Sequence, residues 1–287
     1  MVLYPLNTFP DSAGSKLRHG TPVARGRPID DNVVSAWEAI EKKQKQNAEA
    51  WWLIAQPDHA ALAGDLAASI ACFYFPKLEP DVVDAISLHD AGWAQFDRPD
   101  ERIASLPSAE NPPVKASDSG RPLSFLDMSP ADFVRAWSDS IERAQQSSPI
   151  GGILVSQHFC RLAENRLGMR ADKPADTDRL KAFIASEAAR QRRLASNVKR
   201  DAEHVQLFVH VLQFCDLLSL YLCCGAKEDV VLPQKFQDHA ILLRRDGEMY
   251  RTEPAIFGKG VSLGVSARRH PASRDEVTVV TLGFLLE

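Results

Sequence analysis

The sequence predicts a mainly α protein, built as a helical bundle that carries a small β appendage at its C-terminal end. Apolar residues recur at helical spacing through most of the chain from residue 31 to residue 225. The most apolar stretch, VQLFVHVLQFCDLLSLYLCC, is typical of a helix buried at the centre of such a bundle. After Gly225 the pattern changes, because runs of β-forming residues alternate with turn sequences such as DG and FGKG.

These patterns divide the 287 residues into three segments. Residues 1–30 are rich in Pro, Gly and Arg and are expected to be irregular, with a strand left open near Val2–Tyr4. Residues 31–225 are expected to form the helical domain, and residues 226–287 a small β-rich appendage packed on it.

The helical domain is expected to contain seven helices and one long loop. Asp30 or Asp31 can cap the first helix, and Asp58 is a candidate cap for the second. Between them, the run WWLIAQ suits either a buried strand or the lead-in to a helix. Residues 98–129, rich in Pro, Ser, Asp and Asn, are expected to form a long loop. The predicted helices span residues 31–49, 58–73, 80–96, 130–146, 149–168, 176–200 and 201–224.

Composition and charge argue against several classes of function. Lys and Arg total 34 against 38 Asp and Glu, and this weak acidic balance argues against a nucleic-acid partner. No signal peptide is expected, and no run approaches the roughly 20 apolar residues of a membrane span. We therefore expect a cytoplasmic protein with no membrane partner, and its oligomeric state is left open. The five cysteines form no CxxC pair, so a cysteine metal site is not expected.

Polar residues inside the apolar helices indicate a functional site. His59, His89 with the adjacent Asp90, and Asp216 stand where packing alone favours Leu or Val. A buried carboxylate must be paired, hydrogen-bonded, protonated or bound to a cation. Imidazoles and carboxylates from separate helices suit a divalent transition metal such as Fe, Mn, Zn or Ni. We expect the ligand atoms of these four residues to converge within about 5 Å. His158, also on an apolar helix, is a further candidate ligand.

The order of His, then His-Asp, then a distant Asp resembles the HD superfamily of metal-dependent phosphohydrolases, which includes some iron oxygenases. The strings WWLIAQPDHAALAGDLA, LHDAGWAQFDRP, SGRPLSF, VSQHF and QFCDLLSLYLC resemble, more specifically, the uncharacterised bacterial family named domain of unknown function 3891. The resemblance implies an HD-domain-like helical bundle across residues 31–225. It also implies His59, His89, Asp90 and Asp216 as metal ligands. Dinuclear members add two histidines; His158 fits one position, and His204 or His210 could fit the other.

Three residues are candidates for catalysis or substrate binding. His158 could protonate a leaving group if it does not bind the metal. Arg121 could hold an anionic group, because guanidinium binds phosphate and carboxylate bidentately. Asp97 could bind substrate or orient a ligand histidine, although a helix-ending cap explains it equally well.

Two classes of function remain open from the sequence. The first is a metal-dependent hydrolase, of the phosphohydrolase kind, that acts on a small anionic substrate through a metal-activated water. A di-iron oxygenase on the same ligands is its variant. The second is a non-catalytic module that binds a small ligand or a protein partner.

Overall fold

A computed structural model describes residues 1–6, 34–97, 116–117, 120–271 and 279–287 of the chain. The described α-helices are α1 (Ala36–Lys45), α2 (Gln56–Ala68), α3 (Pro80–Leu88), α4 (Ala94–Asp97), α6 (Pro130–Ser147), α7 (Pro149–Met169), α8 (Pro174–Ala195) and α9 (Ala202–Cys223). Short 3₁₀ turns are η1 (Ala91–Trp93) and η2 (Phe125–Asp127). The described strands are β1 (Val2–Leu6), β2 (Val34–Ser35), β3 (Ala50–Ile54), β4 (Val230–Phe236), β5 (His239–Asp246), β6 (Met249–Glu253), β7 (Val261–His270) and β8 (Val279–Leu286).

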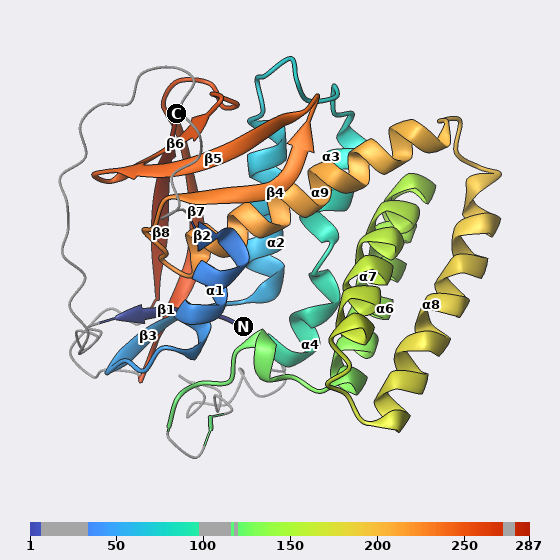
Figure 1. The fold of residues 1–287 in the computed structure, drawn as a ribbon, viewed down its shortest axis with the longest axis horizontal. Coiled ribbons are helices and arrows are strands. Elements are labelled where there is room, and N and C mark those ends of the chain that lie inside the picture. Colours follow the sequence, from blue (N-terminus) through green and yellow to red (C-terminus); the bar gives the residue numbers. More distant parts are fainter. Residues whose placement is uncertain (7–33, 98–115, 118–119, 272–278) are drawn as a thin grey trace.

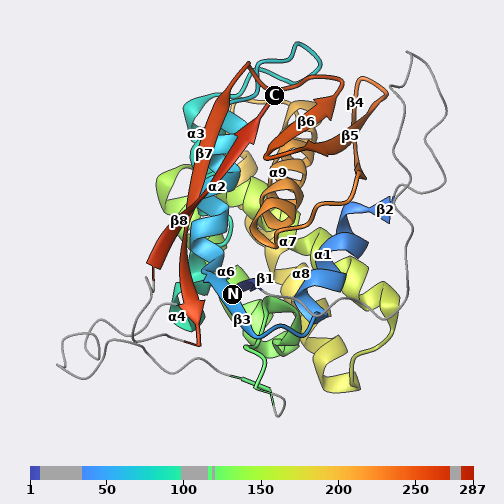
Figure 2. The ribbon, with the colours of Figure 1, turned by 90° about the vertical axis from the view of Figure 1, so that its left-hand side faces the viewer.

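The elements form a sheet on one side of the molecule and layers of helices behind it (Figures 1 and 2). Helix α2 packs on β7 and helix α9 packs on β4, so these two helices lie directly behind the sheet. Helices α6, α7 and α8 pack against one another on the side away from the sheet. Helices α2 and α9 therefore lie between two covering layers, which makes them the best-shielded elements for a buried site.

The described strands form a single mixed sheet in the order β1-β3-β7-β8-β6-β5-β4-β2. Strand β1 pairs with β3, and β3 pairs in turn with β7, with Trp51 opposite His270. At the other edge β2 pairs in parallel with β4. Strands β1, β3 and β2, from the N-terminal part of the chain, thus form the two edges of the sheet, and the five strands β4–β8 from the C-terminal part form its middle.

The expectation of a mainly α, HD-domain-like bundle with a small C-terminal β appendage is therefore wrong. The eight strands among the described residues build a sheet that is a full layer of the fold. The physical reason is that strand pairing joins segments some 200 residues apart, whereas hydrophobic periodicity reports only on near neighbours. The division of the chain at residues 30 and 225 stays a prediction, although the sheet contains strands from each of the three segments.

Several local predictions agree with the structure. The observed bounds of α6, α7, α8 and α9 lie close to those predicted, except that α8 ends at Ala195 rather than near residue 200. The run WWLIAQ forms β3 and leads directly into α2. The helix begins at Gln56 with no side-chain cap, and Asp58 lies inside its first turn, so the prediction that Asp58 caps it is wrong. Of the expected irregular segment and long loop, residues 7–30, 98–115 and 118–119 lie outside the described residues.

The predicted helix over 80–96 is broken in the structure. Helix α3 ends at Leu88, His89 takes the cap position, and Asp90 leaves helical geometry at φ −111° and ψ 19° before η1 and α4 follow. This break removes the regular 100° offset between the two side chains. It lets His89 and Asp90 approach a common point.

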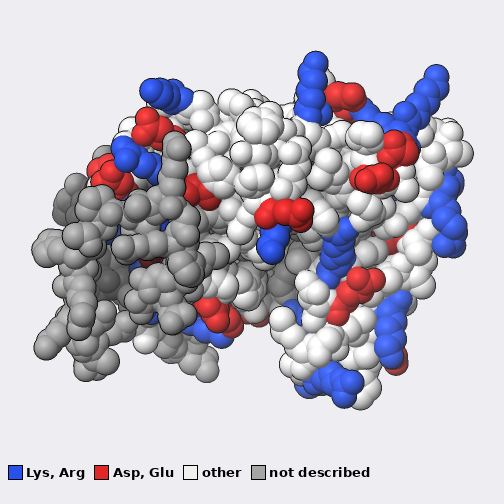
Figure 3. All heavy atoms as spheres, turned by 45° about the horizontal axis from the view of Figure 1, so that its top comes forward, with Lys and Arg blue, Asp and Glu red and all other residues white. Residues whose placement is uncertain are grey.

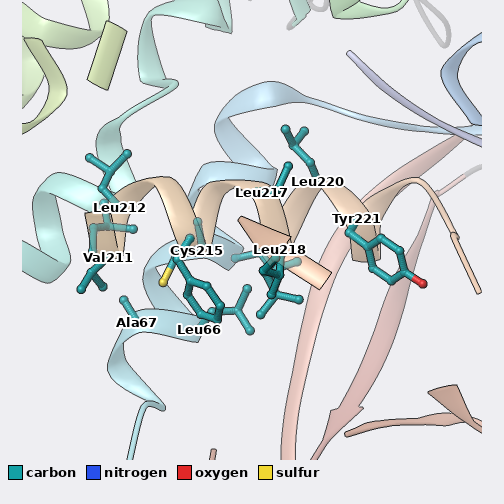
Figure 4. Packing of buried hydrophobic residues seen from close by; sticks show 14 of the residues in the cluster. Leu66, Ala67, Val211, Leu212, Cys215, Leu217, Leu218, Leu220 and Tyr221 are labelled. Carbon is teal, nitrogen blue, oxygen red and sulfur yellow. The ribbon is translucent and has the colours of Figure 1, made fainter. Parts of the chain in front are cut away.

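Helix α9 is the buried core helix that the sequence predicts. Its side chains Val211, Leu212, Cys215 and Leu218 lie near α2 residues such as Leu66 in the core cluster (Figure 4). The helix is long and apolar enough to cross a membrane by composition, but 72% of that window is buried inside the protein. The Asp201 side chain caps its first turn by accepting from the amide of His204 at 2.8 Å. Asp216, in the middle of this helix, is flanked by densely packed apolar side chains.

Charged side chains of both signs are interspersed over the described part of the face shown in Figure 3. The five cysteines are all free; Cys215, Cys223 and Cys224 are buried, and the other two are half-buried. Burial raises the pKa of the Cys224 thiol to about 12, so it stays protonated at neutral pH.

Candidate metal centre

Three helices and the turn that follows α3 bring the candidate ligands together. His59 lies in the first turn of α2, His89 caps α3, Asp90 follows it, and Asp216 lies in the middle of α9. His59 and His89 are fully buried, and the side chain of Asp216 is 15% exposed. Ligand atoms of His59, His89 and Asp216 all lie within 4.8 Å of one another.

The hydrogen bonds of His59 fix its tautomer and leave a lone pair facing a carboxylate. The hydroxyl of Ser219 donates to the carbonyl oxygen of Asp216 at 2.8 Å. Its oxygen must then accept from Nδ1–H of His59, which lies 2.9 Å away. In the neutral imidazole Nε2 is unprotonated, and it lies 2.9 Å from Oδ2 of Asp90. Two acceptors at this distance need a proton or a cation between them.

His89 repeats the same arrangement. Its Nδ1 lies 2.7 Å from the carbonyl oxygen of Ile86, which can only accept, so Nδ1 carries the hydrogen. Its Nε2 lies 3.3 Å from Oδ1 of Asp216 and 3.9 Å from Oδ2 of Asp90. Nε2 of each histidine therefore faces a carboxylate, and each pair needs either a proton or a shared cation between its two atoms.

His158 completes one side of the cluster from α7. It is 2% exposed, and its Nε2 lies 3.6 Å from Oδ2 of Asp216. Its Nδ1 is buried and has no hydrogen-bond partner among the described residues. The ring of His89 meets the ring of His158 edge-on at 5.6 Å and that of His59 at 5.2 Å. His158 and His89 thus contact Asp216, and His59 and His89 lie near Asp90.

The electrostatics of the cluster favour a positive charge within it. Burial alone would lower the pKa of His89, but the carboxylates of Asp90 and Asp216 raise it to about 9. Burial opposes ionisation of Asp216 as well, yet the neighbouring histidines lower its pKa to about 2. Burial lowers the pKa of His158 to about 4, so its ring is neutral at physiological pH and free to offer a lone pair.

Close packing of α2 on α3 sets the distance between two of the ligands. A Cβ added to Gly64 of α2 would lie 1.7 Å from Oγ and 2.8 Å from Cβ of Ser87 on α3. Gly92, after the His-Asp pair, lies equally close to α6, where an added Cβ would meet the Ala136 carbonyl oxygen at 2.1 Å. Only glycine fits at either contact without a shift of the helices.

Asp97 and Arg121 make structural contacts. Asp97 accepts from the amide of Gln56 at 2.7 Å at the start of α2, and its other oxygen lies 3.0 Å from the α-amino group of Met1. It therefore positions the helix that carries His59. Arg121 donates to the carbonyl oxygen of Gln44 and pairs with Asp127, both at 2.9 Å.

The two histidines of α9, His204 and His210, do not belong to the buried cluster. His204 has a side chain that is 64% exposed and bonds to Asp201, the cap of α9. His210 is also exposed. Of the candidate histidines, the structure therefore brings only His59, His89 and His158 to one centre.

Three contributors were not singled out by the sequence. Gly64 is inconspicuous in a helix of small residues, and only the α2–α3 contact reveals its role. Ser219 lies one turn after Asp216 on α9, and only the structure shows that it contacts His59. Arg161 follows His158 by three residues on α7, and this spacing places both near one side of the helix. The sequence could therefore have indicated that Arg161 lies near the candidate site.

A comparison with family models matches residues 44–270 to the family described as Protein of unknown function (DUF3891). No curated protein and no solved structure shows significant similarity to the chain. The matched span includes all the cluster residues as well as β3 to β7. The family therefore comprises both the helical layers and most of the sheet.

Proposed function

We propose that this chain, which belongs to the DUF3891 family of proteins of unknown function, is a metal-dependent hydrolase of small anionic phosphoesters. In this proposal the His, His-Asp, Asp set corresponds to the metal ligands of the HD superfamily. The fold around that set differs from a plain helical bundle, because a full sheet covers α2 and α9.

One observation carries the proposal: Nε2 of His59 and Nε2 of His89, both buried, lie 2.9 and 3.3 Å from the carboxylates of Asp90 and Asp216. A single divalent cation at their common centre would satisfy His59, His89, Asp90 and Asp216 together. The donor set fits a borderline transition metal, since it combines neutral imidazole nitrogen with carboxylate oxygen. Ser219 and the carbonyl of Ile86 supply the outer hydrogen bonds that orient ligand histidines in metal sites.

A bound metal supplies a water of lowered pKa and polarises a phosphoryl oxygen. The chain's own residues orient the ligands, balance the charge and provide a proton carrier. His59 and His89 are held in one tautomer by their Nδ1 hydrogen bonds, and Asp90 and Asp216 balance the charge. His158, neutral and buried beside Asp216, can bind as a further ligand or carry a proton at Nε2.

The test is hydrolysis of a phosphoester panel by protein loaded separately with Mn²⁺, Fe²⁺, Zn²⁺ and Ni²⁺. We expect activity with at least one metal, and a loss of at least a hundredfold in Asp216→Ala. His204→Ala is the matched control, because it removes an exposed histidine from the same helix.

Activity that is equal in Asp216→Ala and the wild type would refute the hydrolase proposal. Oxygen uptake by the iron-loaded protein, without phosphoester hydrolysis, would replace it with the oxygenase alternative.

A further inference from the structure

A small pocket lies between helices α7, α8 and α9, on the side of α7 that carries Arg161. Its volume is about 270 Å³. Its polar lining consists mainly of amide and charged side chains, namely Gln157, Arg161, Glu164, Gln191 and Gln206. Cys160, Ile184 and Ala188 complete the lining. The pocket thus has a polar wall, in which Gln206 already donates to Gln157 and Gln191 to Ser156.

Arg161 stands between this pocket and the metal centre. It lies one turn after His158 on α7, and its Nη1 donates to Oε1 of Gln213 at 2.8 Å. Gln213 lies one turn before Asp216 on α9. The other terminal nitrogen of Arg161 donates to Oε1 of Gln206, which lines the pocket. Arg161 therefore contacts the pocket wall through Gln206, and through Gln213 it contacts the helix that carries Asp216.

Two neutral acceptors orient the charge of Arg161, and the carboxylate of Glu164 on the same helix acts on that charge without forming an ion pair. Among the described residues no carboxylate lies within ion-pair distance of it, and its two bonded acceptors are neutral amides. Arg166, on the same helix, instead pairs with Asp172 at 2.8 Å, and Arg200 pairs with Asp81. A half-buried guanidinium held by neutral acceptors keeps its charge available for an anion. Burial lowers the pKa of Arg161, and the carboxylate of Glu164 opposes that effect.

We propose that this pocket binds a sugar phosphate, free or within a nucleotide, with Arg161 on the phosphate and the glutamine amides and Glu164 on the sugar hydroxyls. This inference rests on the proposed phosphoester hydrolase, and it names Arg161 as the group that would hold the phosphate. The amide bonds to Gln206 and Gln213 fix the guanidinium so that little side-chain freedom is lost on binding. The small volume favours a pentose phosphate over a larger ligand.

The experiment measures binding of three probes to the metal-loaded full chain by calorimetry: inorganic phosphate, ribose 5-phosphate and AMP. Arg161→Ala should weaken all three at least tenfold while metal content stays at the wild-type level. Arg161→Lys keeps the positive charge but loses the planar set of donors. Its affinity for the probes should lie between that of the wild type and that of Arg161→Ala. Arg166→Ala, on the same helix, is the control and should bind as the wild type does.

A second variant tests the pocket itself. Ala188→Trp should fill it and weaken ribose 5-phosphate at least tenfold while leaving inorganic phosphate unchanged. Tighter binding of AMP than of ribose 5-phosphate would identify the nucleotide as the source of the sugar phosphate. If Arg161→Ala and Arg161→Lys, both folded by circular dichroism, bind the probes as the wild type does, the inference is overturned. Wild type that holds metal but binds no probe overturns this inference alone, whereas wild type without metal overturns the proposed function.

Discussion

Replacement of Gly64 by alanine should separate the two helices that carry His59 and His89. The added Cβ would lie 1.7 Å from Oγ, 2.8 Å from Cβ and 3.1 Å from Cα of Ser87. Rotation of the Ser87 side chain relieves only the first contact. Carbon atoms in optimal contact are about 3.5–4.0 Å apart, so α2 and α3 must move apart by about 0.5 Å.

Two opposing effects set the magnitude of the stability change. Overpacking a tight contact costs about 1–3 kcal/mol. Alanine instead of glycine inside a helix returns about 1 kcal/mol. We therefore expect the metal-free Gly64→Ala protein to lose about 1 kcal/mol of unfolding free energy. The metal centre should suffer more, because a displacement of about 0.5 Å is at the limit of what a preorganised site tolerates. Metal affinity should fall at least tenfold.

The assay combines urea unfolding of the metal-free protein with metal titration by calorimetry. The double variant Gly64→Ala with Ser87→Gly removes both clashing side-chain atoms and should recover most of the lost affinity. A Gly64→Ala protein with wild-type stability and wild-type metal affinity would show that the α2–α3 contact does not set the ligand geometry.

Three further outcomes are expected. Ser219→Ala should reduce metal affinity 10- to 100-fold in titrations, because His59 loses the acceptor that orients it; wild-type affinity would refute this role. Metal-free protein should lose stability as the pH rises from 6.5 to about 9, because the raised pKa of His89 stabilises the fold only while the ring is protonated; urea unfolding should show a smaller slope in Asp216→Asn, and an equal slope would contradict the pairing. Asp97→Ala should speed amide hydrogen exchange in the first turn of α2, where Gln56 loses its acceptor, and unchanged exchange would exclude that function.

The sequence predicted the helices better than the sheet. Helix α9 was recognisable because its apolar run is continuous, and its Asp216 was conspicuous because a carboxylate in that setting needs a partner. The extent of the sheet was not predicted, because the pairing of β1 and β3 with each other and with β7 joins distant parts of the chain. Their local sequences, such as VLYPL, carry no sign of a partner far along the chain.

The candidate site was largely visible in the sequence, because its residues are polar groups in apolar helices. The cluster of His59, His89 and Asp216 follows from that mismatch, and the structure brings their ligand atoms within 4.8 Å. The roles of Asp97 and Arg121 could not be derived in this way. Each has a polar environment of its own, made by Met1 and Gln56 for one and by Gln44 and Asp127 for the other, and only three-dimensional contacts separate such groups from substrate-binding ones.

The most direct test of the metal centre is elemental analysis of the purified protein after incubation with divalent transition metals and removal of excess metal. The wild type and the control Asp84→Ala, an exposed residue of α3, should retain about one equivalent of one metal per chain. Asp90→Ala and Asp216→Ala, each shown to be folded, should retain almost none. Retention in the two site variants equal to that of the wild type, or no retained metal in the wild type, would contradict the account.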